Sequence, residues 1–326
     1  MKTEILRLLR ESDSFVSGQQ LCEQFQVSRT AVWKVIKQLQ EEGYQIEAVR
    51  NKGYRITGSP DVMTEEELTS LLDTRWAGKH ISYFDTTDST NNQAKAMGDA
   101  GAPHGTLVVA DRQDAGKGRR GRVWSTPPGG SIAMSILLRP DIEPSKAPML
   151  TLVMAMAVAE GISQTEKLDA GIKWPNDIVL SKKKVCGILT EMSTEITCIN
   201  HVVIGAGINV NLTEFPEEIA KTATSLRIEK GEVIKRSELI AAIMKRFEYR
   251  YEQFMQTEDL SLMQEDYHSI LLNREKKVRI LSPKEEYDGV ALGINEKGEL
   301  LVRRENGSVE EIFSGEVSVR GIYGYV

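Results

Sequence analysis

A glycine-rich basic segment, GKGRRG at residues 116–121, constrains the fold of this chain more than any other feature. It fits the G-x-G-x-x-G pattern of a dinucleotide-binding loop and follows an apolar, strand-like stretch at 106–110. In a dinucleotide-binding fold, that loop opens a helix. Here two prolines and two glycines follow at 127–130, and a helix cannot start there. The segment therefore belongs to a loop between two strands, 106–110 and 131–138, and a Rossmann fold is excluded.

The same loop concentrates positive charge. Lys117, Arg119, Arg120 and Arg122 lie close together in it, and Trp124 follows. Such cations repel one another, and the glycines make ordering the loop costly in entropy. A phosphate would neutralise the charges, so we expect a loop that is mobile when empty and ordered by a phosphorylated ligand. A solvated basic loop, or a nonspecific contact with nucleic acid, fits the loop equally well when it is taken alone.

Two further segments place polar or small residues in apolar surroundings. The sequence KWPND at 173–177 lies within an expected strand, GIKWPNDIVL, and Lys184 follows before another apolar stretch. A lysine there can hold a fixed positive charge against a carboxylate or phosphate. Lys184 also ends a run of three lysines, which is typical of an exposed turn. The sequence GAGINVN at 205–211 would let its backbone approach a ligand, or it marks a kinked strand.

The N-terminal residues 1–57 predict three helices followed by a β-hairpin. The helices are expected at 2–11, 17–25 and 28–43, and Ser28 caps the third. The hairpin follows, around the turn Asn51-Lys52-Gly53. This order of elements is that of a winged helix-turn-helix.

In such a unit the third helix enters the major groove of DNA. We expect DNA contacts from the helix-turn-helix region Gly18 to Lys37, with Ser28, Arg29, Thr30, Trp33 and Lys34, and from a wing that carries Arg50, Lys52 and Arg55. The third helix has no acidic residue between Arg29 and Gln40, which favours DNA. The alternative is a helical packing module that contacts only protein.

Composition and charge limit the class of protein. With 40% hydrophobic and 27% charged residues the chain is globular, neither disordered nor fibrous. The net charge of −6 argues against nucleic acid covering the whole surface, whereas residues 1–60 hold nine Lys and Arg against seven Asp and Glu. The apolar stretch 147–159 is too short to span a membrane. Cys22, Cys186 and Cys198 share no close spacing, so we expect reduced thiols and a cytoplasmic location without a signal peptide.

Three domains are expected. Gly58-Ser59-Pro60 forms a linker, and beyond Asn273 short strand-like segments alternate with glycine turns as in a small β-barrel. Between them lie β-branched strands and long helices, as in an α/β or α+β body. The predicted boundaries are 1–60, 61–272 and 273–326.

Together the motifs resemble the family of bifunctional biotin–protein ligases and biotin-operon repressors of the BirA type. The matching residues are Asp88-Ser-Thr-Asn91, Gln113 with the loop GKGRRGR and Trp124, KWPND at 173–177, Lys184 with GIL at 187–189, and GAGIN at 205–209. The resemblance covers nearly the whole chain. It implies an α+β multidomain fold: a winged helix-turn-helix, a central mixed α/β ligase domain like that of class II synthetases, and an SH3-like C-terminal β-barrel.

The resemblance implies an ATP-dependent biotin–[acetyl-CoA-carboxylase] ligase. With ATP and Mg²⁺, biotin would form biotinyl-5′-AMP, and biotin would then pass to a lysine of the biotin carboxyl carrier protein. The adenylate would also act as corepressor of a homodimer that binds operator DNA. The protein would have no membrane partner.

The resemblance also assigns residues. Catalysis would rest on Lys184 and Arg119, and the metal has no firm ligands, Asp177 being a weak candidate. The biotin-binding residues would be Ser89, Thr90, Asn91, Gln113, Lys117, Gly118, Arg119, Lys184 and Gly207. The adenylate-binding residues would be Arg120, Arg122, Trp124, Asp177 and Asn209. Members of the family often have arginine where this chain has Lys117, which keeps the charge but loses the planar fork of a bidentate contact.

Three other functions stay open at this point. A lipoate- or octanoate-transferring relative would share the core fold but usually lacks the basic loop and the KWPND segment. A non-enzymatic repressor that senses a metabolite would bind ligand without releasing pyrophosphate. A plain DNA-binding adaptor fits least well, because the chain beyond residue 60 is acidic and the loop carries ligand chemistry.

Overall fold

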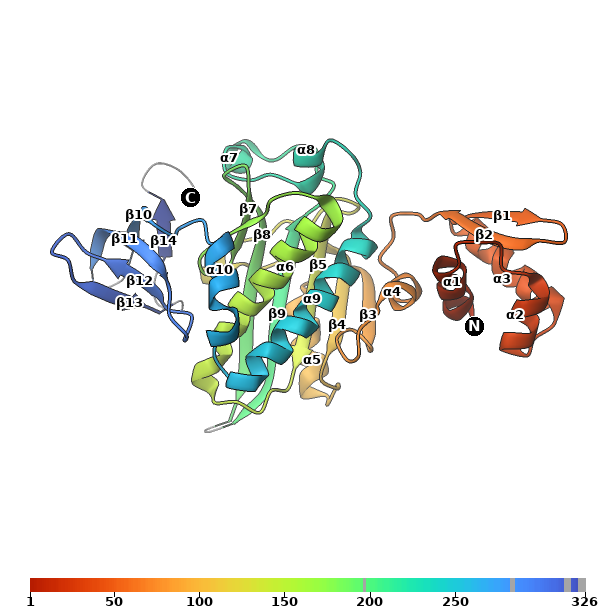
Figure 1. Cartoon of the computed structure of the whole chain (residues 1–326), viewed down its shortest axis with the longest axis horizontal. Helices are drawn as coiled ribbons and strands as arrows, with labels where there is room; N and C mark the ends of the chain where they lie inside the picture. Colours follow the sequence, from red (N-terminus) through yellow and green to blue (C-terminus); the bar gives the residue numbers. More distant parts are fainter. Residues whose placement is uncertain (196–197, 282–284, 314–317, 322–326) are drawn as a thin grey trace.

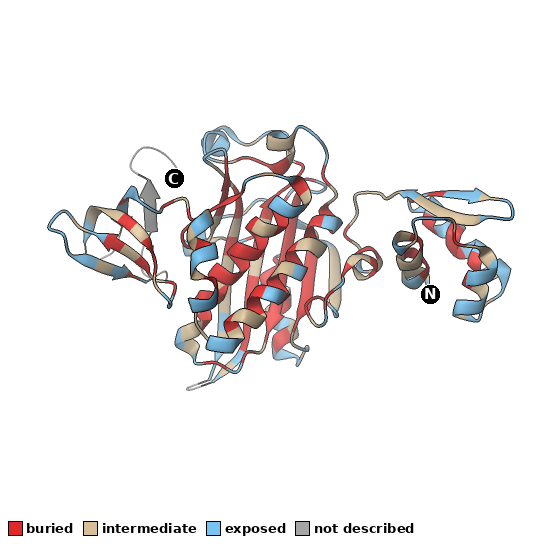
Figure 2. Cartoon of the chain, in the orientation of Figure 1, coloured by how far each residue is buried: buried red, intermediate tan, exposed pale blue. Residues whose placement is uncertain are grey.

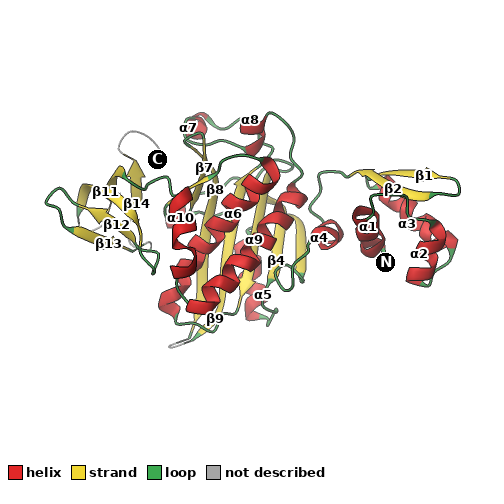
Figure 3. Ribbon diagram, viewed as in Figure 1, coloured by secondary structure: helices red, strands yellow, loops and turns green. Residues whose placement is uncertain are grey.

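The computed structural model of the chain describes residues 1–195, 198–281, 285–313 and 318–321. Three units of secondary structure follow one another along the long axis of the molecule (Figure 1). The N-terminal helices and hairpin lie at one end, a large sheet covered by helices occupies the middle, and a small sheet lies at the other end (Figure 3). This is the predicted order of units.

The N-terminal unit is the expected winged helix. Its elements are α1 (Lys2–Glu11), α2 (Gly18–Phe25), α3 (Arg29–Glu41), β1 (Gln45–Val49) and β2 (Gly53–Gly58). The side chains of Ser17 and Ser28 accept hydrogen bonds from backbone amides in the first turns of α2 and α3, which fixes where both helices start. Gln26 ends α2 in the left-handed conformation, and this makes the tight turn. Ile5, Leu21 and Leu39 are buried in a core of the unit's own.

The middle unit is built on a seven-stranded mixed sheet with the order β3-β4-β5-β9-β8-β7-β6. Its strands are β3 (Ile81–Thr87), β4 (Thr106–Gln113), β5 (Ser131–Leu138), β6 (Gly171–Lys173), β7 (Asp177–Leu180), β8 (Lys183–Thr194) and β9 (Ile199–Asn209). Among the described strand pairs of this sheet, β3 and β4 alone are parallel. The basic loop joins β4 to its antiparallel neighbour β5, as predicted, and contains one short 3-10 turn, η1 (Arg119–Gly121).

Helices lie on both faces of this sheet and around its edges. They are α4 (Glu65–Leu71), α5 (Thr90–Asp99), η2 (Pro144–Met149), α6 (Leu150–Glu166), α7 (Glu217–Ala220), α8 (Leu226–Lys230), α9 (Arg236–Thr257), η3 (Ser261–Met263) and α10 (Gln264–Ile270). The long helices α6 and α9 pack side by side over one face (Figure 1). The stretch Pro144–Glu166 is long and apolar enough to cross a bilayer, but 72% of its apolar window is buried inside the protein, as in a core helix (Figure 2).

Side chains of successive strand residues point to opposite faces. On β4, Leu107 and Val109 belong to the main core beneath α6 and α9, whereas Val108 packs with Ala94 of α5 in a separate small cluster. Helix α5 therefore lies on the opposite face of the sheet from α6. A cavity lies on this face of the sheet, beside the start of α5.

The segment GIKWPNDIVL differs from the prediction of a single strand. It forms two short antiparallel strands, β6 and β7, joined by a tight turn at 174–176. Pro175 has no N–H to donate to a sheet, which explains the break at this point. The turn brings Lys173 and Asp177 opposite each other as ladder partners.

The C-terminal unit is a five-stranded antiparallel sheet with the order β13-β12-β11-β10-β14. Its strands are β10 (Lys276–Leu281), β11 (Glu286–Ile294), β12 (Leu300–Arg303), β13 (Val309–Ile312) and β14 (Ser318–Gly321). The small antiparallel unit is confirmed. Its closure into an SH3-like barrel stays a prediction, because residues 314–317 and 322–326 lie outside the described part of the chain.

Candidate functional site

One cavity of about 960 Å³ gathers every residue that the sequence predicted for ligand binding or catalysis in the middle unit. These residues are Ser89, Thr90, Asn91, Gln113, Lys117, Gly118, Arg119, Arg120, Arg122, Trp124, Asp177, Lys184, Gly207 and Asn209. They come from α5, β4, the basic loop, β7, β8 and β9. The volume lies in the range of sites that enclose a small molecule or cofactor.

The floor of the cavity is a row of small residues across three neighbouring strands. Ala133 of β5 pairs with Gly207 of β9, and Gly207 pairs with Gly187 of β8. Asp177 of β7 continues the row as the partner of Gly187. Because these positions lack large side chains, the sheet is hollowed on the side of α5 and another group can lie flat against its backbone.

Trp124 of the basic loop lies on this floor. A Cβ atom added to Gly207 would lie 2.3 Å from the indole Nε1, and one added to Gly187 would lie 3.3 Å from the ring. The Nε1 atom is buried and has no hydrogen-bond partner within the described structure. Only glycine at position 207 leaves room for the ring in this place, so the loop and the floor fit each other.

Uncharged polar groups form a connected network at the end of the cavity near α5. Gln113 Oε1 accepts hydrogen bonds from the amide and hydroxyl of Thr90, at 2.8 and 3.1 Å. The hydroxyl of Ser135 donates to Asn91 Oδ1 at 2.6 Å. Asn91 in turn donates to the carboxylate of Glu191 at 2.7 Å. The network holds these amide and hydroxyl groups in fixed orientations, which suits a rigid polar ligand.

The cations of the site are partnered in different ways. Lys184 Nζ lies 2.6 Å from Asp177 Oδ1 and 5.5 Å from the centroid of the Trp124 ring. Arg119 donates to Asn176 Oδ1 at 3.1 Å. Burial lowers the pKa of Arg119, and the nearby charge of Asp177 opposes this shift. The other three cations of the loop, Lys117, Arg120 and Arg122, are exposed.

The sequence did not single out two parts of the site. Ser135 and Glu191 connect to the polar network, and the only signal for Ser135 was a hydroxyl within an apolar strand. The far wall of the cavity is formed by residues 212–223, which include Phe215 and Ile219. The backbone of Thr222 accepts a hydrogen bond from the amide of Lys184 at 2.8 Å, so this segment fixes the lysine. It carries no chemical motif, and only its position in the fold reveals it.

The predicted DNA-contact residues lie on one open face of the winged helix. Ser28, Arg29, Thr30, Trp33, Lys34 and Lys37 are all exposed. Trp33 is 53% exposed, an unusual degree for so large an apolar ring. On the hairpin, Arg50 and Lys52 are exposed, whereas Arg55 pairs with Glu47 at 2.8 Å and stacks on Phe15. Arg55 is therefore already engaged within the unit.

Comparison with known proteins follows the three units. The HTH domain family matches residues 2–55, the biotin/lipoate A/B protein ligase family matches 83–209, and the biotin protein ligase C terminal domain matches 275–320. The chain is 41% identical over 322 residues to the bifunctional ligase/repressor BirA of Bacillus spizizenii, with 98% of both chains covered. The identity to BirA of Escherichia coli is 29% over 318 residues, covering 97% of this chain and 96% of the relative.

A solved structure agrees with the sequence matches. The biotin protein ligase from Aquifex aeolicus in complex with biotin and ATP superposes with a TM-score of 0.66 at 32% identity, covering 74% of this chain and 99% of that chain.

Proposed function

This chain belongs to the family of bifunctional ligases and repressors of the BirA type. We propose that biotin and ATP react in its cavity to form biotinyl-5′-AMP, and that its winged helix binds operator DNA in response. It is an ATP-dependent biotin–[acetyl-CoA-carboxylase] ligase and a repressor. The observation that carries the proposal is the convergence of the predicted ligand residues on one cavity.

The first half-reaction brings two anions together. A carboxylate oxygen of biotin attacks the α-phosphorus of ATP, the bond to the bridging oxygen breaks, and pyrophosphate leaves with that electron pair. Lys184 and Arg119 supply positive charge at the meeting point without transferring a proton. Lys184 would exchange its contact with Asp177 for the ligand, and Arg119 would exchange its contact with Asn176.

The polar network and the basic loop would bind different parts of the ligand. Ser89, Thr90, Asn91 and Gln113 would bind the ureido ring of biotin, and Lys117, Gly118 and Gly207 would line its acyl chain. Trp124 and Asn209 would face the adenine base, and Arg120 and Arg122 would approach the phosphates. With the loop closed over the small-residue floor, water is excluded from the mixed anhydride, which hydrolyses readily.

The second half-reaction releases AMP. The amine of a lysine on the carrier protein attacks the acyl carbon of biotinyl-5′-AMP, the bond to the phosphate oxygen breaks, and a proton is lost from nitrogen. The carrier must approach the open side of the cavity, where the exposed cations of the loop lie.

Mg²⁺ is expected to enter with ATP. Within the described ranges, no group of three or more His, Cys, Asp or Glu side chains could hold a metal ion by itself. The cavity is lined by two carboxylates, Asp177 and Glu214. A magnesium ion carried by phosphates needs only one or two protein carboxylates, so Asp177 fits as a ligand. When bound, the ion would neutralise charge on the phosphates.

The repressor half of the proposal rests on the N-terminal unit. We take the domains as 1–60, 61–272 and 273–326, with the exposed face of α3 entering the major groove of operator DNA. Biotinyl-5′-AMP would order the loop and favour a homodimer that presents two winged helices to a palindromic operator. Cys22, Cys186 and Cys198 are free thiols, which supports a cytoplasmic location.

The test is a pyrophosphate-release assay on the full chain with ATP and either biotin, lipoate or octanoate. Biotin alone should support release, and addition of a biotin carboxyl carrier domain should give labelled carrier. Release with lipoate in place of biotin would make the chain a lipoate-type enzyme. Binding of biotin without any release of pyrophosphate would make it a sensor and would overturn the ligase proposal.

A further inference from the structure

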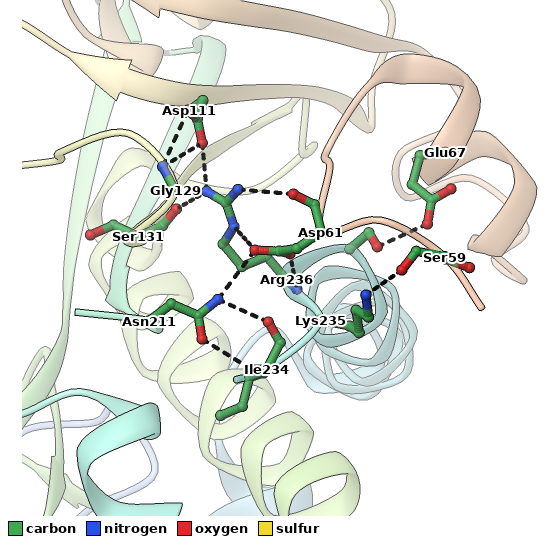
Figure 4. Close-up of polar contacts among 11 residues, drawn as sticks. Ser59, Asp61, Glu67, Asp111, Gly129, Ser131, Asn211, Ile234, Lys235 and Arg236 are labelled. Carbon is green, nitrogen blue, oxygen red and sulfur yellow. Dashed lines mark hydrogen bonds and ion pairs between the residues drawn. The ribbon is translucent and has the colours of Figure 1, made fainter. Parts of the chain in front are cut away.

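A buried polar junction lies outside the ligand cavity, where α9 begins. Arg236, the first residue of α9, is only 4% exposed, and its guanidinium is surrounded by oxygen acceptors from three separate segments. The segments are the linker after the winged helix, strand β4, and the start of β5 where the basic loop ends (Figure 4). None of these contacts belongs to the ligand chemistry described above.

On one side the junction fixes the end of the basic loop. Arg236 Nη1 donates to Asp111 Oδ1 at 2.5 Å and to the carbonyl of Ser131 at 3.0 Å. The same carboxylate of Asp111 accepts from the amide of Gly129, at 3.1 and 3.3 Å. The carbonyl of Gly130 accepts from the amides of Val210 and Asn211. Asp111 therefore fixes the end of the basic loop, residues 129–131, where it rejoins the sheet. Arg236 in turn fixes the carboxylate of Asp111.

On the other side the junction holds the linker. Asp61 accepts from the amide and Nε of Arg236, both at 2.9 Å, and from Asn211 Nδ2 at 3.2 Å. The next residue of α9, Ser237, donates to Glu67 of α4 at 3.1 Å. Figure 4 shows Asp61 and Asp111 on opposite sides of the one guanidinium.

Glu67 carries the connection into the winged helix. Its side chain is 1% exposed, and its two oxygens accept from Arg10 of α1 at 2.7 and 2.8 Å and from the hydroxyl of Tyr44 at 2.5 Å. Lys235, just before α9, donates to the carbonyl of Ser59 in the linker. Hydrogen bonds, together with the backbone between Arg236 and Ser237, thus connect the winged helix through α4 and the start of α9 to the end of the basic loop.

We propose that Arg236 is a positioning residue that couples closure of the basic loop to the position of the winged helix on the middle unit. One buried cation is shared by two carboxylates, so a change in its contact with Asp111 alters its contact with Asp61. Coupling of this kind is reciprocal: a better-fixed linker favours the closed loop, and a closed loop orders the linker. The inference rests on the proposed function, because the junction would couple adenylate binding in the cavity to the position of the DNA-binding unit.

The sharpest variant is Asp61→Asn, because Asp61 contacts neither the loop nor the cavity. Its two oxygens accept from three N–H donors, so an asparagine in either orientation turns an NH₂ group toward a donor. The matched control is Asp73→Asn, which removes an ion pair of 2.9 Å between α9 and the segment after α4. The side chains of that pair are 60% and 88% exposed, and they lie outside the junction.

The first readout needs no ligand. Hydrogen exchange followed by mass spectrometry should show faster exchange at residues 126–131 in Asp61→Asn, by about three- to tenfold, and no change in Asp73→Asn. Unchanged exchange at 126–131, with faster exchange confined to the linker at 58–64, would overturn the coupling. This readout stands even if the full chain fails to release pyrophosphate, so it separates failure of the coupling from failure of the proposed function.

The second readout uses the active protein. A loop that closes less often binds ligand more weakly, so Asp61→Asn should raise KM for biotin by about three- to tenfold while kcat stays within about twofold. General destabilisation would instead lower kcat at constant KM, and that result would contradict a positioning role. Arg236→Lys keeps the charge and should recover part of what Arg236→Met loses. Should the methionine variant not fold, the Asp61→Asn result alone decides.

Discussion

The cavity and the recognition helix both present cations to a phosphorylated partner, but they hold them differently. In the cavity, Lys184 and Arg119 are partly buried and already contact Asp177 and Asn176. On the recognition helix, Lys34 and Lys37 are exposed. Lys37 Nζ lies 3.7 Å from Glu41 in a long surface pair and 5.5 Å from the centroid of the Trp33 ring. A partly buried, preorganised cation can strongly stabilise charge on one bound group. Exposed cations each add a small increment of affinity for DNA, and this affinity falls as the salt concentration rises.

The number of cations alone therefore does not distinguish an enzyme site from a DNA-binding face. Lys184 and Arg119 must each exchange a protein partner for the ligand, so the loss of either removes transition-state stabilisation. Each cation of the helix exchanges water and counterions for a phosphate, so its loss removes one increment of affinity. Lys184→Ala and Lys34→Ala test this distinction directly, whereas Gly207→Ala tests the fit between loop and floor and Asp88→Asn tests the charge at the start of α5.

Lys184→Ala should have the largest effect. Loss of a preorganised charge beside the α-phosphate should slow pyrophosphate release by about 10²-fold or more. Operator binding should recover when synthetic biotinyl-5′-AMP is supplied, because the winged helix is untouched. The control is Lys245→Ala, which removes an exposed lysine of α9. A loss of less than about threefold in Lys184→Ala would show that this partly buried lysine does not stabilise the transition state.

Gly207→Ala should come next. The added Cβ would lie 2.3 Å from the Trp124 Nε1, so the ring must leave the floor of the cavity. Overpacking at this contact should raise KM for ATP by about tenfold. In the double variant with Trp124→Ala the added methyl has no ring to displace, so it should add little to the loss caused by Trp124→Ala alone. If the increases in KM for ATP of the two single variants were instead additive in free energy, the effect of Gly207→Ala would not come from the contact between Trp124 and the floor.

Lys34→Ala should have a moderate effect on one activity only. Operator affinity should fall by about three- to tenfold, with a smaller salt dependence, as expected when a single phosphate contact is lost. Gel-shift titrations at several salt concentrations measure both quantities. Pyrophosphate release should not change. If the substitution abolished ligation, the separation between the two regions would be wrong.

The smallest effect concerns acid stability at the start of α5. Hydrogen bonds from Asn92 and Gln93 lower the pKa of Asp88 from 3.8 to about 2. A carboxyl whose pKa is depressed by folding stabilises the protein above its unfolded pKa and loses that contribution as pH falls through the folded value. The difference in urea midpoint between the wild type and Asp88→Asn should thus be constant above about pH 5 and shrink below about pH 4. A difference that grows on acidification would have the wrong sign.

The sequence predicted most of the features that depend on clustered charges, on glycine and proline, or on helix caps. Ser28 predicted the start of the recognition helix because a helix cap is a local signal, and the cations and glycines of the loop indicate a ligand in the same way. The three units and the strands on both sides of the loop follow from such local signals.

What escaped prediction depends on tertiary contacts. Ser135 joins the polar network only because its strand passes α5, and the wall at 212–223 is defined by its place beside Lys184. Arg236 looks like an ordinary basic residue at a helix start, yet it meets Asp61 and Asp111 from far along the chain. The hairpin at 174–176 was missed because its apolar flanks suggested one strand.

In the proposed mechanism the basic loop closes over an acyl adenylate that is made in the cavity. The most direct measurement is a crystal structure of the full chain grown with biotin, ATP and Mg²⁺. We expect density for biotinyl-5′-AMP between Lys184 and Trp124, with residues 116–130 ordered around it. An empty cavity, or adenylate density beneath a loop that stays disordered, would contradict the account.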